Sequence, residues 1–447
     1  MFVDTSRKYR NFEGFGASGA WWAQLVGGWP CRDEIVRLLY SPDDGIGLTA
    51  YRYNIGAGSA RSGLGDIGNP LRRTDCFETA PGRYDFDRDR EAVSVLRAAV
   101  RYGAKEVVFF VNSPPERLTV SGMAHCDRRR PFRNNLPRGN EAAFADFCLD
   151  VTEHFVREGL PVKYLSPINE PLWVWNGGQE GCHYSPAAAA RVMGLIARKM
   201  DDRPALRDVK LSGFENGDVR WFNRTYTRYL FRDPAVSRRA PGVDVHSYFL
   251  NPGPIPILND RAGFLRRFRR WMERRYPDKT IRMSEWCHMQ GGRDSSMASA
   301  LVMARVIWED LTILNASAWQ HWIAVSEVDY CDGLIYIDPE TQTYSLTKRY
   351  YATGNFSKYI PVGAVRVRAE TRDKALLACA FAHPDGLTAV VVNETAQTRA
   401  IDLPENAYLA VVTDDAQDLA EHPISGRRLT LTPRSVTTIL CRKEDAS

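Results

Sequence analysis

Two glutamates, Glu170 and Glu285, each come directly after an apolar stretch of the chain. Neither has a Lys or Arg four residues away that would explain it as half of a helical surface ion pair. Two carboxylates that face one pocket are what the cleavage of a glycosidic bond requires, one holding a proton and the other ionised. The simpler alternative is that both are solvated glutamates at the ends of strands.

Aromatic side chains accompany the two glutamates. Indole rings suit the flat apolar faces of sugars, while amides and imidazoles can read sugar hydroxyls. For any single tryptophan, packing at the rim of a sheet is an equally simple explanation. In the loop 171–184 we expect Trp173, Trp175 and His183 to contact a sugar. The tryptophans at or just beyond predicted strand ends are Trp173, Trp175, Trp286, Trp319 and Trp322.

Eight short apolar runs alternate along the chain with longer amphipathic stretches. A strand buried on both faces of a sheet reads as a continuous apolar run, and strands that alternate with helices indicate a parallel sheet. Eight repeats over about 330 residues are typical of a closed (β/α)8 TIM barrel, which we expect at residues 11–350. The predicted strands are 11–18, 47–54, 106–112, 162–169, 209–213, 242–248, 280–285 and 315–322, and the predicted helices are 90–102, 140–158, 185–200, 262–276 and 296–313.

The active site of such a barrel lies at the carboxyl ends of its strands. Several of the predicted strands end in polar groups that a plain hydrophobic core would not need. Besides the two glutamates, these groups are Arg52, Asn112, Asn169, His246 and Tyr248.

The pattern changes from about Ala364 onward, where short alternating or β-rich runs replace helical periodicity. Such runs predict an appended antiparallel β-sandwich, which we place at residues 351–447 with a junction at 352–364. We expect residues 1–10 to add a strand to this sandwich. The fold class is therefore α/β, a TIM barrel with an all-β side domain.

Composition limits the classes of partner. Hydrophobic residues make up 44% and charged residues 25% of the 447, and the net charge is only +5. The arginines between 266 and 275 are explained more simply by a solvated helix face than by a nucleic-acid surface. We therefore expect no nucleic-acid partner. We also expect no membrane partner, because no apolar run approaches the ~18 residues of a membrane span.

Nine cysteines occur without a repeating spacing, which predicts no disulfide framework and favours a reducing, cytoplasmic location. Three pairs of adjacent Cys and His, 125–126, 182–183 and 287–288, raise the alternative of a zinc site. Their spacing is not that of a structural zinc motif, and adjacent ligands fit one ion poorly. We therefore expect no metal and no cofactor.

Six segments carry a resemblance to a known family: "RYNIGAG", "FVNSPPERLT", "SPINEP", "DVHSY", "MSEW" and "SAWQHW". Together, in this order, they resemble family 30 of the glycoside hydrolases across residues 11–345. The β-rich tail resembles the side sandwich of that family. "FEGFGASGAWWA" with "NSPP" looks closest to its endo-β-1,6-galactanase-like branch. The N-E-P motif alone recurs in other barrels, so the ordered set carries the resemblance.

The resemblance implies a retaining β-glycosidase that acts on β-linked glycosides or oligosaccharides. It implies that Glu170 is the general acid/base and Glu285 the nucleophile. Asn169 would hydrogen-bond the 2-hydroxyl of the sugar, and Arg52 and Tyr248 would hold Glu285 ionised and oriented.

Further site residues are expected from the same comparison. His246 would orient a neighbouring carboxylate or line the sugar site, and Trp319 would form the floor of the reacting subsite. We also expect Asn112 and Trp286, at the ends of the third and seventh predicted strands, to bind substrate.

The chain departs from that branch at Pro115-Glu116-Arg117-Leu118, where relatives carry the aromatic-rich "SPPYWM". Arg117 could contact an acidic sugar there, or could form a local salt bridge with Glu116 or Asp127. Two other functions stay open at this point: a non-catalytic carbohydrate-binding protein on a degenerate barrel, and a metal-dependent barrel hydrolase.

Overall fold

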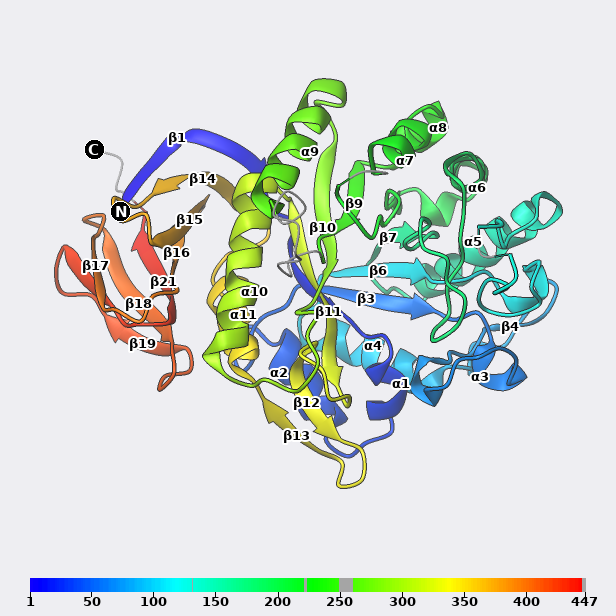
Figure 1. Ribbon diagram of the computed structural model, residues 1–447, viewed down its shortest axis with the longest axis horizontal. Helices are drawn as coiled ribbons and strands as arrows, with labels where there is room; N and C mark the ends of the chain where they lie inside the picture. The colour runs from blue at the N-terminus through cyan, green and yellow to red at the C-terminus, as the bar shows by residue number, and fades with distance from the viewer. Residues whose placement is uncertain (131, 221–222, 249–259, 444–447) are drawn as a thin grey trace.

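The computed structural model describes residues 1–130, 132–220, 223–248 and 260–443. A barrel of strands wrapped by helices occupies one end of the molecule, and a β-sandwich occupies the other (Figure 1). The chain starts at the sandwich with β1 (Phe2–Asn11) and then enters the barrel.

Eight parallel strands build the barrel, and each overlaps one of the eight apolar runs identified in the sequence. They are β2 (Gly14–Ser18), β3 (Ala50–Ile55), β6 (Glu106–Val111), β7 (Val162–Ser166), β8 (Lys210–Leu211), β9 (Gly242–His246), β10 (Thr280–Trp286) and β11 (Ala318–Ser326). The predicted TIM barrel with its side sandwich is confirmed.

The ring of strands runs in the order β9-β10-β11-β2-β3-β6-β7-β8. Between β8 and β9 it closes through a parallel bridge that pairs Asn216 with Val245. Beside it, a second parallel bridge joins Asn169 to Glu215, just beyond the ends of β7 and β8. The seam of the barrel, meaning the bridge between Asn216 and Val245, therefore lies at the carboxyl ends of the strands.

Helices cover the outside of the barrel. In α4, alanine, valine and leucine side chains recur on one face and are buried against the sheet. The start of α6 is set by Ser185, whose hydroxyl accepts from the N–H of Ala188, and by Pro186 in the first turn. The helices are α1 (Trp22–Val26), α2 (Arg32–Tyr40), α3 (Ser59–Ser62), α4 (Arg90–Tyr102), α5 (Glu141–Arg157), α6 (Pro186–Asp201), α7 (Asn223–Leu230), α8 (Pro234–Arg239), α9 (Arg261–Arg275) and α10 (Met297–Glu309), which continues into a π-helical turn, η6 (Asp310–Leu314).

A buried arginine fills the lower interior of the barrel. Arg282 of β10 is 2% exposed and donates from Nη2 to Oε1 of Glu106 at 2.8 Å. Its guanidinium lies 3.6 Å from the ring centre of Tyr164 and within salt-bridge distance of Glu13 and Asp244. Arg282 thus faces carboxylates from β6, β9 and the turn before β2, of which Glu106 also pairs with Lys163 at 2.7 Å.

Two short strand pairs and six helices are not among the elements predicted from the sequence; the helices are α1, α2, α3, α7, α8 and one at the expected junction. β12 (Gly333–Asp338) and β13 (Thr343–Leu346) extend the sheet beyond β11, and β4 (Glu78–Ala80) pairs with β5 (Arg83–Tyr84). The expected junction at 352–364 overlaps α11 (Lys348–Ser357). Asn355 of this helix donates to the carbonyl of Val411 in the sandwich at 2.9 Å, and the hydroxyl of Ser357 donates to the carbonyl of Ile46 in the barrel. This helix therefore ties the two parts together.

The sandwich contains a seven-stranded antiparallel sheet in the order β1-β14-β15-β16-β21-β18-β19, faced by the pair β17-β20. β1 pairs antiparallel with β14, so the first residues of the chain belong to this sheet. The remaining bounds are β14 (Val365–Glu370), β15 (Leu376–His383), β16 (Gly386–Asn393), β17 (Arg399–Asp402), β18 (Ala407–Thr413), β19 (Ala420–Pro423), β20 (Arg428–Leu431) and β21 (Ser435–Arg442).

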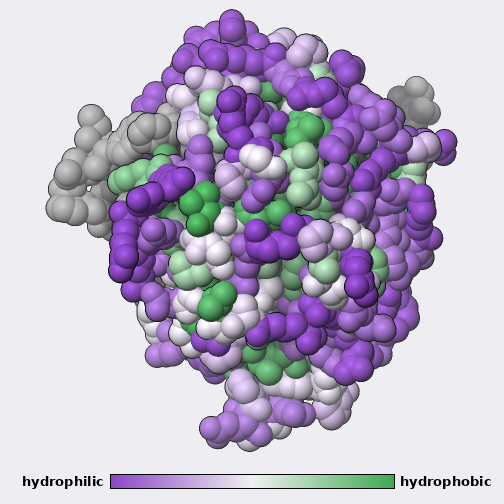
Figure 2. Space-filling view, turned by 90° about the vertical axis from the view of Figure 1, so that its right-hand side faces the viewer, coloured by the Kyte–Doolittle hydropathy of each residue, from purple (hydrophilic) through white to green (hydrophobic). Residues whose placement is uncertain are grey.

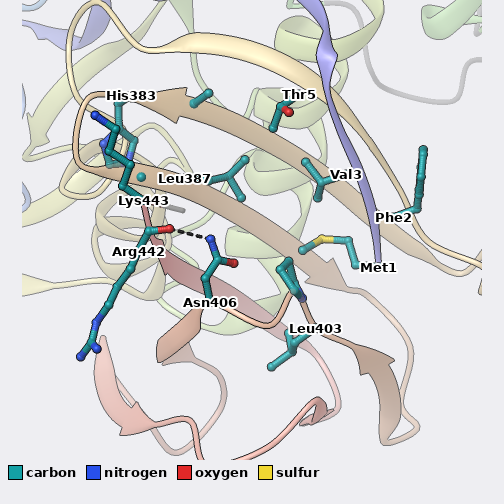
Figure 3. Close-up of a pocket in the computed structure, with 13 residues that line it drawn as sticks. Met1, Phe2, Val3, Thr5, His383, Leu387, Leu403, Asn406, Arg442 and Lys443 are labelled. Atoms are coloured by element: carbon teal, nitrogen blue, oxygen red, sulfur yellow. Dashed lines mark hydrogen bonds between the residues drawn. The ribbon is translucent and has the colours of Figure 1, made fainter. Parts of the chain in front are cut away.

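An open groove of about 480 Å³ lies on the sandwich beside the start of the chain (Figure 3). Met1, Val3 and Leu387 give it an apolar wall, and Asn406 donates to the carbonyl of Arg442 at its edge. In the described part of the chain, no helix is both long and apolar enough to cross a membrane.

The Arg282 cluster yields a stability prediction. Replacing Arg282 by Met leaves Asp244 buried without its cation and Glu106 with Lys163 alone, which should cost about 3–5 kcal/mol of unfolding free energy. The midpoint of urea unfolding measures this loss. The control is Arg305→Met, which breaks only the partly exposed ion pair with Glu394 and should cost at most about 1 kcal/mol. Equal shifts in the two variants would contradict the role given to Arg282.

Candidate active site

The carboxyl ends of the barrel strands meet on one face of the molecule. In Figure 1 the arrows of β3 and β6 point toward this face, and Figure 2 looks directly at it. Hydrophobic residues show in the middle of the face, inside a rim of mostly hydrophilic ones (Figure 2). The predicted site residues are found behind this surface, and several of them contact one another.

Glu285 is held from two sides. Arg52 of β3 donates from Nη1 to Oε2 at 2.7 Å, and the hydroxyl of Tyr248 donates to Oε1 at 2.6 Å. Burial raises the pKa of Glu285 above its usual value, and the charges of His246 and Arg52 offset this only in part. Two donors on two different oxygens fix the carboxylate in a single orientation.

Glu170 has an unusual backbone. Its φ is +43°, in the left-handed region that residues other than glycine seldom adopt. Its N–H donates to the carbonyl of Glu215 at 2.7 Å, and its own carbonyl accepts from Nε1 of Trp175 at 3.0 Å. These bonds hold the residue in a conformation that directs its carboxylate toward His246, whose Nδ1 lies 2.8 Å from Oε1.

The two carboxylates face each other across a short gap. Nδ1 of His246 lies 2.8 Å from Oε1 of Glu170 and 3.4 Å from Oε1 of Glu285. One oxygen of each carboxylate and a ring nitrogen of His246 all lie within 4.8 Å of one another. The pairing that the sequence suggested between residues 115 positions apart is thus present in space.

Glu215 is a third carboxylate of the site, and it was not predicted. Its Oε2 accepts from Nη2 of Arg52 at 2.9 Å and lies 3.2 Å from Nε2 of His246. Burial opposes its ionisation, but Arg52 and His246 outweigh burial and lower the pKa of Glu215 to about 2. The predicted fifth strand, 209–213, ended two residues before Glu215, and in the structure β8 itself ends at Leu211. Extending it through Phe214 would have placed an acidic residue at this strand end too.

His246 sits between the three carboxylates and is completely buried. Burial by itself would lower the pKa of this imidazole. The carboxylates of Glu285, Glu170 and Glu215 overcome that effect and raise it to about 10.

A chain of amides supports Asn169. Its Nδ2 donates to Oδ1 of Asn112 at 2.9 Å, and Nδ2 of Asn112 donates to Oδ1 of Asn54 at 3.2 Å. Nη2 of Arg52 donates to Oδ1 of Asn169 at 3.2 Å. Asn112 therefore lies in the site, as expected, next to Asn169.

The loop 171–184 places its aromatics around Glu170. Trp173 is 37% exposed, and its Nε1 lies beside Gly217, as does Oε1 of Glu170. Trp175 packs against Gly181, and His183 is buried with Nδ1 3.3 Å from the carbonyl of Trp173. Of these three, Trp173 presents the most open surface beside the carboxylates.

Trp286 and Trp319 do not face the barrel interior, which corrects their expected contact with sugar. Nε1 of Trp319 donates to Oδ2 of Asp310, in the turn that follows α10, and its ring lies 6.5 Å from that of Phe15. The ring of Trp286 lies 6.1 Å from Trp319 and is nearly parallel to that of His288, which bonds to Ser299 of α10. Both indoles are buried between the strands and the outer helices.

Trp322 takes the place expected of Trp319. Side chains alternate along a strand, so Trp322 lies on the opposite face of β11 from Trp319. Its ring centre is 5.7 Å from the guanidinium of Arg52 and 6.3 Å from the ring of Phe110. Trp322 is therefore the indole that borders the carboxylate cluster from β11.

The three Cys-His pairs do not converge. The backbone N–H of His183 donates to Sγ of Cys126 at 3.2 Å, but His288 bonds to a helix on the outside of the barrel. Within the described residues, Glu170, His246 and Glu285 form the only group of three His, Cys, Asp or Glu side chains that comes close enough to share an ion. Arg117 pairs through two nitrogens with Glu78, not with Glu116 or Asp127.

Comparison with known families decides what kind of site this is. Residues 1–336 match the family model described as O-Glycosyl hydrolase family 30. The chain belongs to glycoside hydrolase family 30. Residues 363–439 match the beta sandwich domain of the same family. The protein is therefore a glycoside hydrolase with a carbohydrate substrate, and this prediction from the sequence is confirmed.

Individual relatives agree with the family. An endo-beta-1,6-galactanase of Hypocrea rufa is 24% identical over 396 residues, which cover 81% of this chain and 75% of that protein. A putative glucosylceramidase of Caenorhabditis elegans is 24% identical over 480 residues, which cover 99% of this chain and 82% of that protein. Among solved structures, a conserved exported protein from Bacteroides fragilis is 25% identical with a TM-score of 0.86, covering 98% of this chain and 99% of that one.

The close approach of Gly217 to Glu170 gives a prediction for this family member. A methyl group on Gly217 would lie 2.3 Å from Nε1 of Trp173 and 2.6 Å from Oε1 of Glu170. Gly217→Ala should therefore displace the carboxylate and lower kcat/KM by about 10²-fold, measured on an aryl β-glycoside. The control is Gly139→Ala, where the added methyl meets no atom within 4 Å. Wild-type activity in Gly217→Ala would contradict the prediction, because it would mean that catalysis does not need the carboxylate of Glu170 in its present position.

Proposed function

We propose that the enzyme is a retaining β-glycosidase in which Glu285 is the nucleophile and Glu170 the general acid/base. The observation that carries this proposal is the short separation of the two carboxylates, whose nearer oxygens lie within 4.8 Å. Retaining enzymes hold their carboxyl groups about 5–5.5 Å apart, whereas inverting enzymes need about 6.5–9.5 Å to admit a water.

The reaction then proceeds in two displacements. In the first, Oε of Glu285 forms a bond to the anomeric carbon while the glycosidic bond breaks, and Glu170 gives its proton to the departing oxygen. In the second, Glu170 takes a proton from water, the water oxygen bonds to the anomeric carbon, and the carboxylate of Glu285 leaves. The sugar keeps its anomeric configuration.

The surroundings of the two glutamates support this division of roles. Glu285 accepts from Arg52 and Tyr248, and hydrogen bonds and positive charge of this kind favour an ionised carboxylate. Glu170 lies beside Trp173, the most exposed of the three aromatic residues proposed to contact sugar in its loop. A leaving group on that side would meet the acid first.

Asn169 is suited to bind the 2-hydroxyl of the reacting sugar. Asn112 and Arg52 orient its side-chain amide through hydrogen bonds, and Asn169 directly precedes Glu170 in the chain. A hydrogen bond to the 2-hydroxyl strengthens as positive charge develops at the anomeric carbon. Trp322 and Trp173 supply apolar surface for the sugar rings.

For the substrate we propose a β-1,6-linked galactan or its oligosaccharides. The support is the endo-beta-1,6-galactanase of Hypocrea rufa among the relatives, together with the segments "FEGFGASGAWWA" and "NSPP". Arg117 is not assigned to an acidic sugar, because Glu78 already balances its charge.

Substitution of the two glutamates tests the catalytic roles. Glu285→Gln removes the nucleophile and should lower kcat by about 10³-fold or more, equivalent to about 4 kcal/mol of barrier. Glu170→Gln should be equally severe on oligosaccharides. On aryl glycosides with a good leaving group it should slow only the second displacement, because the first then needs no proton. Added azide should restore turnover of such an aryl glycoside by Glu170→Gln and yield the β-glycosyl azide.

The matched control is Glu340→Gln, at an exposed turn between β12 and β13, which should retain wild-type activity. Anomeric configuration of the first-formed product, followed by proton NMR, reports the stereochemistry directly. Near-normal activity of Glu285→Gln, or a product of inverted configuration, would refute the mechanism.

A substrate panel tests the second part of the proposal. Oligosaccharides of β-1,6-galactan should be cleaved with a kcat/KM at least about tenfold above that for xylo-oligosaccharides, because xylose lacks the C6 group that the pocket would contact. Product analysis by chromatography gives the rates. Equal rates, or a preference for xylose or glucose, would reject galactan as the substrate.

A further inference from the structure

One buried carboxylate has no part in the two displacements just described. Glu215 lies beyond the end of β8, and its side chain is 0% exposed. Its Oε2 contacts Arg52 and His246 rather than either catalytic carboxylate. A buried carboxylate is costly unless it is paired. Its partners therefore indicate what it does.

We propose that Glu215 is a positioning residue of the reaction, which orients His246 and sets how tightly that histidine holds the proton it shares with Glu170. This inference rests on the proposed roles of Glu170 and Glu285. It concerns a residue that would act through its neighbours rather than by touching the substrate.

The first argument is the state of His246. The ionised carboxylate of Glu215 can only accept hydrogen bonds, so Nε2 of His246, 3.2 Å away, must carry a hydrogen. This leaves Nδ1 as the nitrogen that faces Oε1 of Glu170 at 2.8 Å. One proton can occupy that contact, either on the carboxyl group of Glu170 or on Nδ1.

The second argument is the proton balance. When the proton is on Glu170, His246 is neutral and the acid is ready to protonate the leaving oxygen. When the proton is on Nδ1, His246 is a cation between three carboxylates, and Glu170 is ionised. The proton count of the site is the same in both states. The negative charge of Glu215 stabilises the imidazolium, so it decides the distribution between them.

The third argument is the backbone. The carbonyl of Glu215 accepts from the N–H of Glu170 at 2.7 Å, and the residue forms the parallel bridge with Asn169. Its side chain also accepts from Arg52, which in turn donates to Glu285. Glu215 thus contacts the supports of both catalytic carboxylates.

The charges around Glu215 determine the sign of the test. Removing one negative charge from this group lowers the pKa of every titrating neighbour, by about 1 unit or more for groups within about 4–6 Å. Both limbs of the pH profile of kcat/KM should therefore move to lower pH. The charged and titratable groups that face Glu215 are Arg52 from β3, Asp244 and His246 from β9 and, across His246, Glu170 after β7 and Glu285 from β10.

The decisive variant is Glu215→Gln, which keeps the shape and one acceptor oxygen but not the charge. We expect both limbs of its kcat/KM profile to shift to lower pH by about 1 unit, with a lower kcat. Glu215→Asp keeps the charge and should retain limbs within a few tenths of the wild type. Glu340→Gln controls for the loss of any carboxylate and should change neither limb.

An unchanged pH profile in Glu215→Gln, with only a lower unfolding temperature, would show that Glu215 is merely a brace and would overturn the inference. That result is distinct from a failure of the proposed function, which would appear as an active Glu285→Gln enzyme.

A second measurement does not depend on the folding of a Glu215 variant. In the wild-type enzyme labelled with ¹⁵N in histidine, Nε2 of His246 should stay protonated across the pH range while Nδ1 titrates. His246→Gln assigns the signals. A bare Nε2 at any pH within the active range would also overturn the inference.

Discussion

The burial of one positive charge constrains the whole site. The guanidinium of Arg52 is completely enclosed, stacked 3.5 Å from the ring centre of Phe110. A buried cation is tolerated only when its surroundings supply acceptors with good geometry, and here Glu285, Glu215 and Asn169 supply them. These three residues come from different strands of the barrel. Satisfying Arg52 therefore aligns those strand ends with one another, and the catalytic geometry follows from that alignment.

The same physics explains which parts of the molecule could be predicted from the sequence. The barrel strands were recognised because most of them are buried on both faces and read as nearly uninterrupted apolar runs; β8, with Lys210 exposed, is the exception. Glu170 and Glu285 stood out because a carboxylate that directly follows such a run has no surface role. The short β-rich runs after Ala364 likewise predicted the antiparallel strands of the sandwich.

Other features depend on contacts that no local pattern contains. Glu215 was missed because β8 has only two residues in regular pairing, and the segment beyond it is held by single bridges. Trp319 was chosen over Trp322 because both lie in one aromatic-rich run, and only the register of β11 with β2 shows which of them points inward. The charge on His246 depends on three carboxylates from three strands, so it could not be inferred before the fold was known.

The seam between β8 and β9 gives the barrel an uncommon property. The ring closes there through the bridge between Asn216 and Val245, whose chain neighbours Glu215 and His246 both belong to the carboxylate cluster. Closing the barrel and assembling the site are consequently one event. Turnover is then a reporter of ring closure during refolding, and a circular permutant or split enzyme cut between β8 and β9 would regain its native secondary structure before it regained catalysis.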